Sequence, residues 1–208
     1  MAKRAYSPKE IEAKRYETLP WGERWSAPFG YPPVNETWFV EGASASGKST
    51  FVMKLAKELC KYGAVLYASY EEGISQSFKE RIEREKMGEV QGRFRVAVDD
   101  SYEELVERLR RPKSPNYVVV DSFQEAYWSY EQARDLITMF PRKSFIFISQ
   151  EDKGQPLGKP AKRLRYKAGI KIRVSGFKAY CRGRYTGDPG SYFVVWEEGV
   201  MRTTNNVQ

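Results

Sequence analysis

Histidine is absent from the 208-residue sequence, and cysteine occurs only twice. Cys60 and Cys181 lie far apart and belong to no C-x-x-C pair. Together these shortages argue against a structural zinc site of the Cys/His type and against a Ser-His or Cys-His nucleophile. Any chemistry that this chain performs must therefore depend on carboxylates, lysine, arginine and metal ions.

Long apolar runs are also missing. No segment approaches the ~18 apolar residues of a membrane span, and the charged N-terminus lacks the apolar stretch that a signal peptide needs. We therefore expect a soluble cytoplasmic protein with no membrane partner. With 41% hydrophobic residues, the chain has the size and composition of one globular domain. We expect that domain at 37–208, preceded by a lead-in at 1–36.

Acidic residues are missing from one part of the chain. Between Lys153 and Tyr185 there is no Asp or Glu, whereas eleven Lys or Arg occur. Subtracting these eleven charges from the net charge of +8 leaves −3 for the rest of the chain. Such a block suits a polyanion or the phosphates of a neighbouring subunit's nucleotide. A solvated basic surface remains an equal alternative on charge alone.

The lead-in is rich in Pro, Gly and aromatic residues and is too short to form its own core. Its large aromatics are Trp21, Trp25, Phe29 and Tyr31. We expect them to pack on the main domain or on a neighbouring subunit. Stacking on bases is the less favoured alternative.

Apolar patterning then alternates between strands and helices. Helical spacing and Gly or Pro stops separate continuous apolar runs that are typical of buried parallel strands. Strands are expected at 37–41, 64–69, 93–98, 116–121 and 144–149, with helices at 48–62, 75–86, 102–109 and 132–140. After residue 168 we expect antiparallel strands in "IKIRVS", "FKAYCR" and "YFVVWEE". The expected fold is α/β, with a mainly parallel sheet between helices on both faces.

The segment "EGASASGKST" fits the spacing G-x-x-x-x-G-K-[ST] of a phosphate-binding loop. A strand precedes it and a helix follows, which is the context that this motif requires. Backbone N–H groups and the helix N-terminus would bind phosphates, Lys48 would reach the β- and γ-phosphates, and Ser49 would ligate Mg²⁺. The expected nucleotide-binding residues are Gly42, Ala43, Ser44, Ala45, Ser46, Gly47, Lys48, Ser49 and Thr50.

Two further carboxylate positions follow strands. Asp121 ends the apolar run "YVVVD", where a Walker-B carboxylate holds Mg²⁺ through water. Glu71 and Glu72 follow "YAS", at the strand ends where ligands of parallel sheets bind. A glutamate there would polarise a water towards the γ-phosphate, although paired glutamates in a surface turn are also common.

In this order, the motifs resemble those of the RecA/RadA-like P-loop ATPases. "VLYASYEEG" resembles the strand and catalytic glutamate of bacterial RadA, and "VVVDSFQ" resembles the family's Walker B element. The resemblance covers about residues 30–200 and implies a RecA-like three-layer fold. The sequence lacks RadA's four-cysteine zinc module and its protease-like C-terminal domain, so we expect a bare ATPase core without zinc.

The resemblance also implies residue roles. Glu71 would be the general base, with Glu72 as the secondary candidate. "FIFISQEDKG" resembles the strand that ends in a γ-phosphate sensor, here Gln150. "GFKAYCRGRYTG" resembles the element that reaches a neighbouring subunit's nucleotide. Arg184 would then be the arginine finger acting in trans, and Arg182 is the runner-up.

Nucleic-acid contacts are implied in two segments. The one after the sensor, "EDKGQPLGKPAKRLRYKAG", is rich in Gly, Pro and basic residues, so we expect a mobile loop that binds phosphates. In the one after Walker B, Tyr127 and Trp128 would either stack on bases or pack in the core of the next helix, which is slightly favoured. The expected DNA-contacting residues are Lys153, Lys159, Lys162, Arg163, Arg165 and Lys167.

The leading hypothesis is an ATP- and Mg²⁺-dependent ATPase that forms homo-oligomers, as a hexameric ring or a filament, and binds DNA, with single strands preferred. Recombination, repair and replication proteins all use such a core. Two alternatives stay open. One is a regulatory or loader protein in which ATP only switches assembly. The other is a small-molecule or nucleotide kinase, whose phosphate-binding arginines would come from "RIERE".

Overall fold

A computed structural model describes residues 4–205. Within that range, the chain forms one nine-stranded sheet in the order β3-β2-β4-β5-β1-β7-β8-β9, and β6 pairs with β5. The six strands from β3 to β7 in this order run parallel to one another, as predicted for the fold class. The strands are β1 (Thr37–Gly42), β2 (Val65–Ser69), β3 (Phe94–Val98), β4 (Tyr117–Asp121), β5 (Ser144–Asp152), β6 (Gln155–Pro156), β7 (Ile170–Ser175), β8 (Lys178–Gly183) and β9 (Phe193–Val194).

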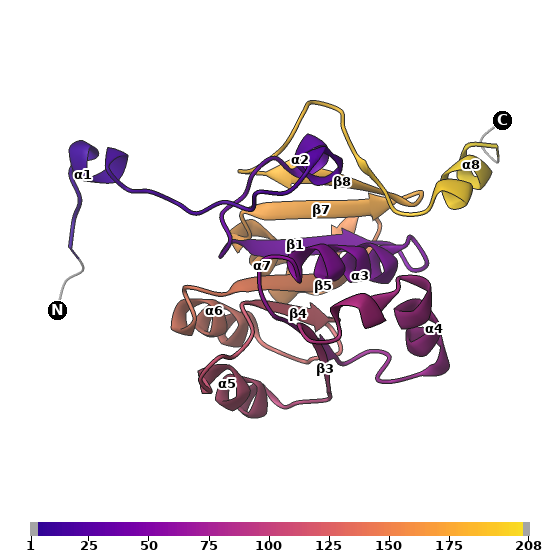
Figure 1. Ribbon diagram of the computed structural model, residues 1–208, viewed down its shortest axis with the longest axis horizontal. Coiled ribbons are helices and arrows are strands. Elements are labelled where there is room, and N and C mark those ends of the chain that lie inside the picture. Colours follow the sequence, from indigo (N-terminus) through magenta and orange to yellow (C-terminus); the bar gives the residue numbers. More distant parts are fainter. Residues whose placement is uncertain (1–3, 206–208) are drawn as a thin grey trace.

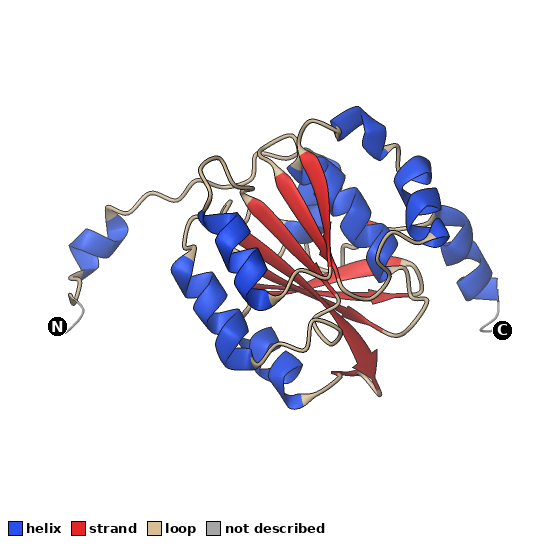
Figure 2. Cartoon of the chain, turned by 90° about the horizontal axis from the view of Figure 1, so that it is seen from below, coloured by secondary structure: helices blue, strands red, loops and turns tan. Residues whose placement is uncertain are grey.

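Helices cover both faces of this sheet, which gives three layers (Figure 2). Helices α2, α3 and α4 contribute to one apolar core, and α5, α6 and α7 contribute to the other. None of the helices described in residues 4–205 is long and apolar enough to cross a membrane. The helices are α1 (Pro8–Glu12), α2 (Glu23–Phe29), α3 (Lys48–Leu59), α4 (Gln76–Arg84), the 3₁₀ helix η1 (Met87–Val90), α5 (Tyr102–Arg110), α6 (Tyr130–Met139), α7 (Lys159–Lys167) and α8 (Glu197–Asn205).

Local sequence explains where these elements begin and end. Every residue of β4 is buried, as its continuous apolar run predicts. Ser75 caps the start of α4, and Ser101 and Ser129 begin α5 and α6 with capping boxes. The predicted helices and strands between residues 37 and 149 are therefore present, with small shifts at their ends.

The lead-in divides into two parts. Trp21, Trp25 and Phe29 are buried against β1, α3 and β9, as predicted for packing on the main domain. Tyr31 is instead 59% exposed. Helix α1 has no buried residue and lies away from the rest of the chain (Figure 1).

Three expectations for the C-terminal part are corrected. The segment after the sensor forms helix α7 where a mobile loop was predicted, because Ala161, Leu164 and Ala168 line one helix face and pack in the core. Strand β7 runs parallel to β1, whereas β8 and β9 are antiparallel. The expected strand "YFVVWEE" is only the two-residue β9, and α8 begins at Glu197.

Candidate active site at the carboxyl edge of the sheet

The predicted phosphate loop connects β1 to α3. Gly47 begins the helix at a φ of 99°, and Ala45 also has a positive φ of 58°. Gly42 lies directly against β7, where an added Cβ would be 2.3 Å from the carbonyl oxygen of Val174. Glycine is therefore needed at both glycine positions of the motif for steric reasons, and the loop lies tightly against the sheet.

The electrostatics of this loop favour an anion. Helix α3 has no side-chain cap and no acidic residue in its first turn, so its N-terminal N–H groups face the loop unneutralised. Within the described residues, the buried Ser46 hydroxyl has no hydrogen-bond partner. Lys48 Nζ donates to the Ala43 carbonyl at 2.6 Å. Burial lowers the pKa of Lys48, while the charges of Glu71 and Asp121 oppose that shift.

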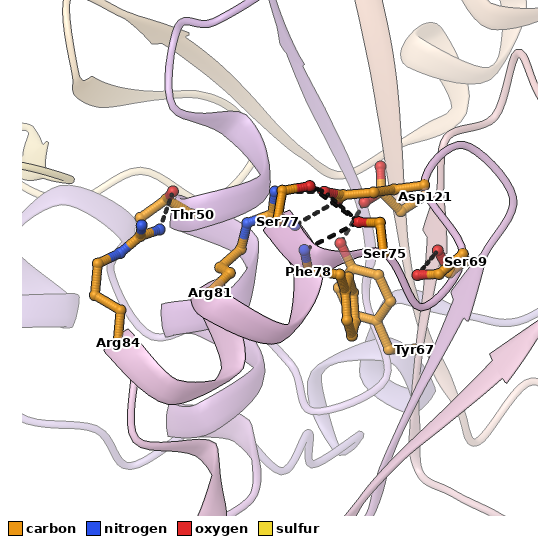
Figure 3. Close-up of polar contacts among 11 residues, drawn as sticks. Thr50, Tyr67, Ser69, Ser75, Ser77, Phe78, Arg81, Arg84 and Asp121 are labelled. Atoms are coloured by element: carbon orange, nitrogen blue, oxygen red, sulfur yellow. Dashed lines mark hydrogen bonds and ion pairs between the residues drawn. The ribbon is translucent and has the colours of Figure 1, made fainter.

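Asp121 is buried at the end of β4 and accepts a hydrogen bond from the Tyr67 hydroxyl of β2 (Figure 3). Burial raises the pKa of Asp121 to about 6, although the Tyr67 hydrogen bond acts in the opposite direction. A buried carboxylate beside a phosphate loop fits Mg²⁺, which binds proteins through one or two carboxylates together with substrate phosphates. Ser49, in the first turn of α3, would supply the second hard oxygen for such an ion.

The neighbouring glutamates Glu71 and Glu72 have different surroundings. Glu72 accepts hydrogen bonds from Ser75, Ser77 and Arg81, all at or on α4. Burial raises the pKa of Glu72, but these hydrogen bonds outweigh it and hold that pKa below its ordinary value. Glu72 is therefore fully engaged in anchoring α4.

Glu71 is exposed and faces the predicted sensor. Its Oε1 accepts a hydrogen bond from Gln150 Nε2 at 3.3 Å. Its backbone N–H donates to the Asp121 carbonyl at 3.2 Å, so β2 and β4 fix its position. The candidate base, sensor and metal carboxylate, which lie far apart in the sequence, thus meet at one edge of the sheet.

A cavity of about 440 Å³ opens beside the first turn of α3. Arg84 of α4, which donates to the Thr50 hydroxyl at 3.3 Å, borders it (Figure 3). Phe177 and Trp196 form its aromatic wall and meet edge to face. Sequence reasoning missed this cavity, and no local signal brings residues 84 and 196 together. Its lining residues are Thr50, Lys54, Arg84, Glu85, Phe177, Val195 and Trp196.

The two candidate finger arginines lie at the opposite end of the sheet. Strand β8 runs antiparallel to β7, so its last residues pair with the first residues of β7. Arg182 pairs with Lys171, and the Arg184 N–H donates to the Gly169 carbonyl. Both arginines are exposed. The phosphate loop follows the other end of β1, which is parallel to β7, so Arg184 is poorly placed to reach its own loop.

The basic block separates into structural and free cations. Arg165 pairs with the buried Glu41 at 3.0 Å, Arg173 pairs with Glu151 at 2.7 Å, and Arg163 pairs with Glu131. Arg163 also lies over the Tyr130 ring. Arg165 thus has a partner inside the fold, and its predicted DNA contact stays a prediction. Lys153, Lys159, Lys162 and Lys167 are exposed and stay candidates.

The aromatic pair after Walker B also separates. Trp128 is buried against Tyr70 and Tyr102, in the core as slightly favoured, although α6 begins two residues later. Tyr127 is 85% exposed with a φ of 55°. Only Tyr127 therefore remains available for stacking on a ligand.

Comparisons with known proteins agree with this architecture. No protein-family profile matches the chain. The DNA repair protein RadA from two strains of Streptococcus pyogenes serotype M3 is 27% identical over 85 residues, which is 41% of this chain and 18% of RadA. The chain thus matches less than a fifth of the length of these curated relatives.

Two solved structures share the fold. Flagellar accessory protein FlaH from Methanocaldococcus jannaschii aligns with a TM-score of 0.56 at 15% identity, covering 86% of this chain and 92% of FlaH. KaiC-like protein PH0186 from Pyrococcus horikoshii aligns with a TM-score of 0.57 at 15% identity, covering 83% and 88%. This chain therefore shares the fold of FlaH and of the KaiC-like protein, and part of it is similar to RadA. The predicted fold class is confirmed.

Proposed function

We propose that this RecA/RadA-like chain binds and hydrolyses ATP, with Mg²⁺ as cofactor, at the carboxyl edge of its sheet. The observation that carries the proposal is the hydrogen bond between Glu71 and Gln150 beside the phosphate loop. A phosphate loop alone indicates binding. A free carboxylate held next to a polar sensor adds a group that can accept a proton from water.

Each residue of the site has a distinct role in this proposal. The loop N–H groups, Ser46 and Lys48 bind the phosphates, and Lys48 exchanges its contact with Ala43 for them. Ser49 and Asp121 would hold Mg²⁺, which supplies charge neutralisation on the phosphates when bound. Glu71 orients and deprotonates the attacking water, and Gln150 positions Glu71. The cavity between Arg84 and Trp196 takes the nucleoside, because a flat base suits an aromatic wall faced by a guanidinium.

The proposal includes assembly and a polyanion partner. Arg184 or Arg182, exposed at the far end of the sheet, would complete the site of a neighbouring subunit. Exposed lysines of the hairpin β5–β6 and of α7, with Tyr127 beside them, would contact single-stranded DNA. RadA is a DNA repair protein, and its partial similarity to this chain supports DNA as the polyanion.

The deciding experiment measures ATP binding and the ATPase rate against protein concentration, with and without single-stranded DNA. We expect a rate per chain that rises with concentration and with DNA. Lys48→Ala should lower the rate by about 10²–10³, because it removes a preorganised charge from the phosphates. Lys61→Ala is the matched control. Lys61 lies beyond the C-terminal end of α3, away from the phosphate loop, and pairs with Glu58 of the last turn.

Three outcomes would contradict parts of the proposal. A full rate in Lys48→Ala would exclude this loop as the active site. Phosphoryl transfer to a small acceptor would indicate the kinase alternative. Assembly that depends on ATP and is unchanged in Glu71→Gln, without any turnover in the wild type, would indicate the switch alternative.

A further inference from the structure

We propose that Gln124 is a positioning residue that couples the catalytic pair Glu71–Gln150 to the basic hairpin β5–β6 and helix α7. The proposal rests on the proposed ATPase function, because it assumes that Gln150 responds to the γ-phosphate. Gln124 lies three residues after Asp121, in the loop between β4 and α6, and is half-buried. Its sequence position gives no indication of this role.

The three described hydrogen bonds of the Gln124 side chain connect strand β5 to Leu157, in the exposed segment before α7. Its Oε1 accepts the backbone N–H of Gln150 at 3.1 Å. Its Nε2 donates to the Ser149 hydroxyl and to the Leu157 carbonyl, each at 2.9 Å. One amide therefore contacts both Gln150, which carries the sensor side chain, and Leu157, which lies two residues before α7.

Backbone hydrogen bonds around Gln124 fix its loop to strand β5, which carries Gln150. The Phe123 N–H donates to the Ile148 carbonyl at 2.8 Å, which ties the loop to β5. The Leu157 N–H donates to the Gln150 carbonyl at 2.9 Å. Gln150 and Leu157 thus form the base of the hairpin, and the Gln124 amide bridges the two in the manner of an additional peptide group.

The exposed side of the connection reaches the candidate polyanion surface. The hairpin turns at Lys153 and Gly154, both with positive φ, and α7 starts two residues after Leu157. The Gln124 side chain also lines a pocket of about 270 Å³ together with Tyr127 and Leu157. A ligand that shifts Leu157 therefore acts on the Gln124 amide, whose oxygen accepts the backbone N–H of Gln150.

Coupling through the Gln124 amide should act from Gln150 on residues 153–167 and from residues 153–167 on Gln150. Coupling between two sites is reciprocal and commonly corresponds to changes of about 5- to 150-fold. A change at Gln150 on γ-phosphate binding should therefore alter the opening of residues 153–167. A polyanion bound to residues 153–167 should alter the turnover number through the same amide.

The test compares amide hydrogen exchange of residues 153–167 in full-length protein with ADP and with a non-hydrolysable ATP analogue. We expect about a fivefold difference in exchange between the two states in the wild type, and loss of that difference in Gln124→Ala. In the same variant, kcat should fall about tenfold with KM unchanged, since nucleotide contacts are intact. Gln91→Ala, which changes an exposed glutamine directly after η1 and outside the measured segment, is the matched control and should behave as wild type.

Gln124→Glu separates the two halves of the amide. Its carboxylate still accepts the Gln150 N–H but cannot donate to Leu157, so we expect kcat near the wild-type value and a lost exchange difference. Retention of the exchange difference in both variants, or its absence from a wild type that hydrolyses ATP, would overturn the coupling. A lowered Tm with an unchanged exchange difference would assign Gln124 a purely structural role and overturn it as well. A wild type that binds no ATP, measured separately by fluorescent-nucleotide titration, would refute the proposed function and this inference with it.

Discussion

The two ends of the central sheet differ in how their charged side chains are engaged. At the carboxyl ends of β1, β2, β4 and β5, the lysine, carboxylates and glutamine of the candidate site contact or act on one another. At the opposite end, Arg182 and Arg184 are exposed, and no ion pair is found for them among the described residues. The first end is held by contacts among its own side chains, whereas the second end presents exposed cations.

This difference follows from strand direction. Parallel strands bring their carboxyl ends together, so the residues after β1, β2, β4 and β5 meet at one edge. Strand β8 reverses direction and carries its terminal arginines to the other edge. A stacked second copy would bring the two edges together, with no change in either fold.

The largest effect is expected at the end of the sheet that carries the exposed arginines. Arg184→Ala should lower the turnover of the assembled protein by about 10³–10⁵, the range for an arginine finger, and leave the residual rate of a dilute monomer unchanged. Rates are measured across protein concentration, with Arg182→Ala as the competing candidate.

Mixing variants sharpens this prediction. A mixture of the two separately purified variants Arg184→Ala and Lys48→Ala should regain activity. Some interfaces in the mixed assembly then pair an intact phosphate loop from one chain with an intact arginine finger from the other. No recovery in the mixture, or an equal loss in the monomer, would contradict action in trans.

The second prediction compares two adjacent residues at the catalytic end. Glu71→Gln should lower kcat by about 10²–10⁴ with nucleotide binding retained, because the proton acceptor is lost. Glu72→Gln should leave the chemistry nearly intact and lower the free energy of unfolding by about 1 kcal/mol through its half-exposed contacts with α4. Single-turnover rates and urea unfolding measure the two effects, and a larger kcat loss in Glu72→Gln would reverse the assignment.

The smallest effect separates structural from free cations in the basic block. Arg165→Ala should destabilise the fold by about 2 kcal/mol, since Glu41 is left buried without its partner, and Glu41→Gln should restore part of that loss. Lys162→Ala should leave unfolding unchanged and lower the salt slope of DNA binding by about 0.7–0.9. Fluorescence anisotropy over a salt series checks the slope, and an unchanged slope would remove Lys162 from the DNA-contacting set.

Much of the fold could be predicted because its signals are local. The apolar run ending in Asp121 and the glycine spacing around Lys48 each specify a strand end or a loop without distant information. Helix α7 could not be predicted in this way, because Gly158, Pro160 and its many cations resemble a loop. Only packing of Ala161 and Leu164 beside α6 makes the segment helical.

Short motifs in the sequence name the residues of the candidate site, whose roles stay predictions, but no motif predicts the contacts among those residues. Tyr67 reaches Asp121 only because β2 and β4 pair in the register that places Ser69 beside Asp121. The choice between Glu71 and Glu72 similarly depends on Arg81, which lies on the following helix and engages Glu72 alone. Long-range register and side-chain competition leave no short pattern in the sequence.

The wall of the cavity beside α3 gives this protein an optical property. Of its five tryptophans, Trp21, Trp25, Trp38 and Trp128 are buried, whereas Trp196 is 39% exposed and lines that cavity. Indole emission depends on the polarity around the ring, so a group entering the cavity would change the signal of Trp196 with little effect on the other four. The chain thus contains an intrinsic fluorophore at the place proposed for the nucleoside, and binding can be followed without any label.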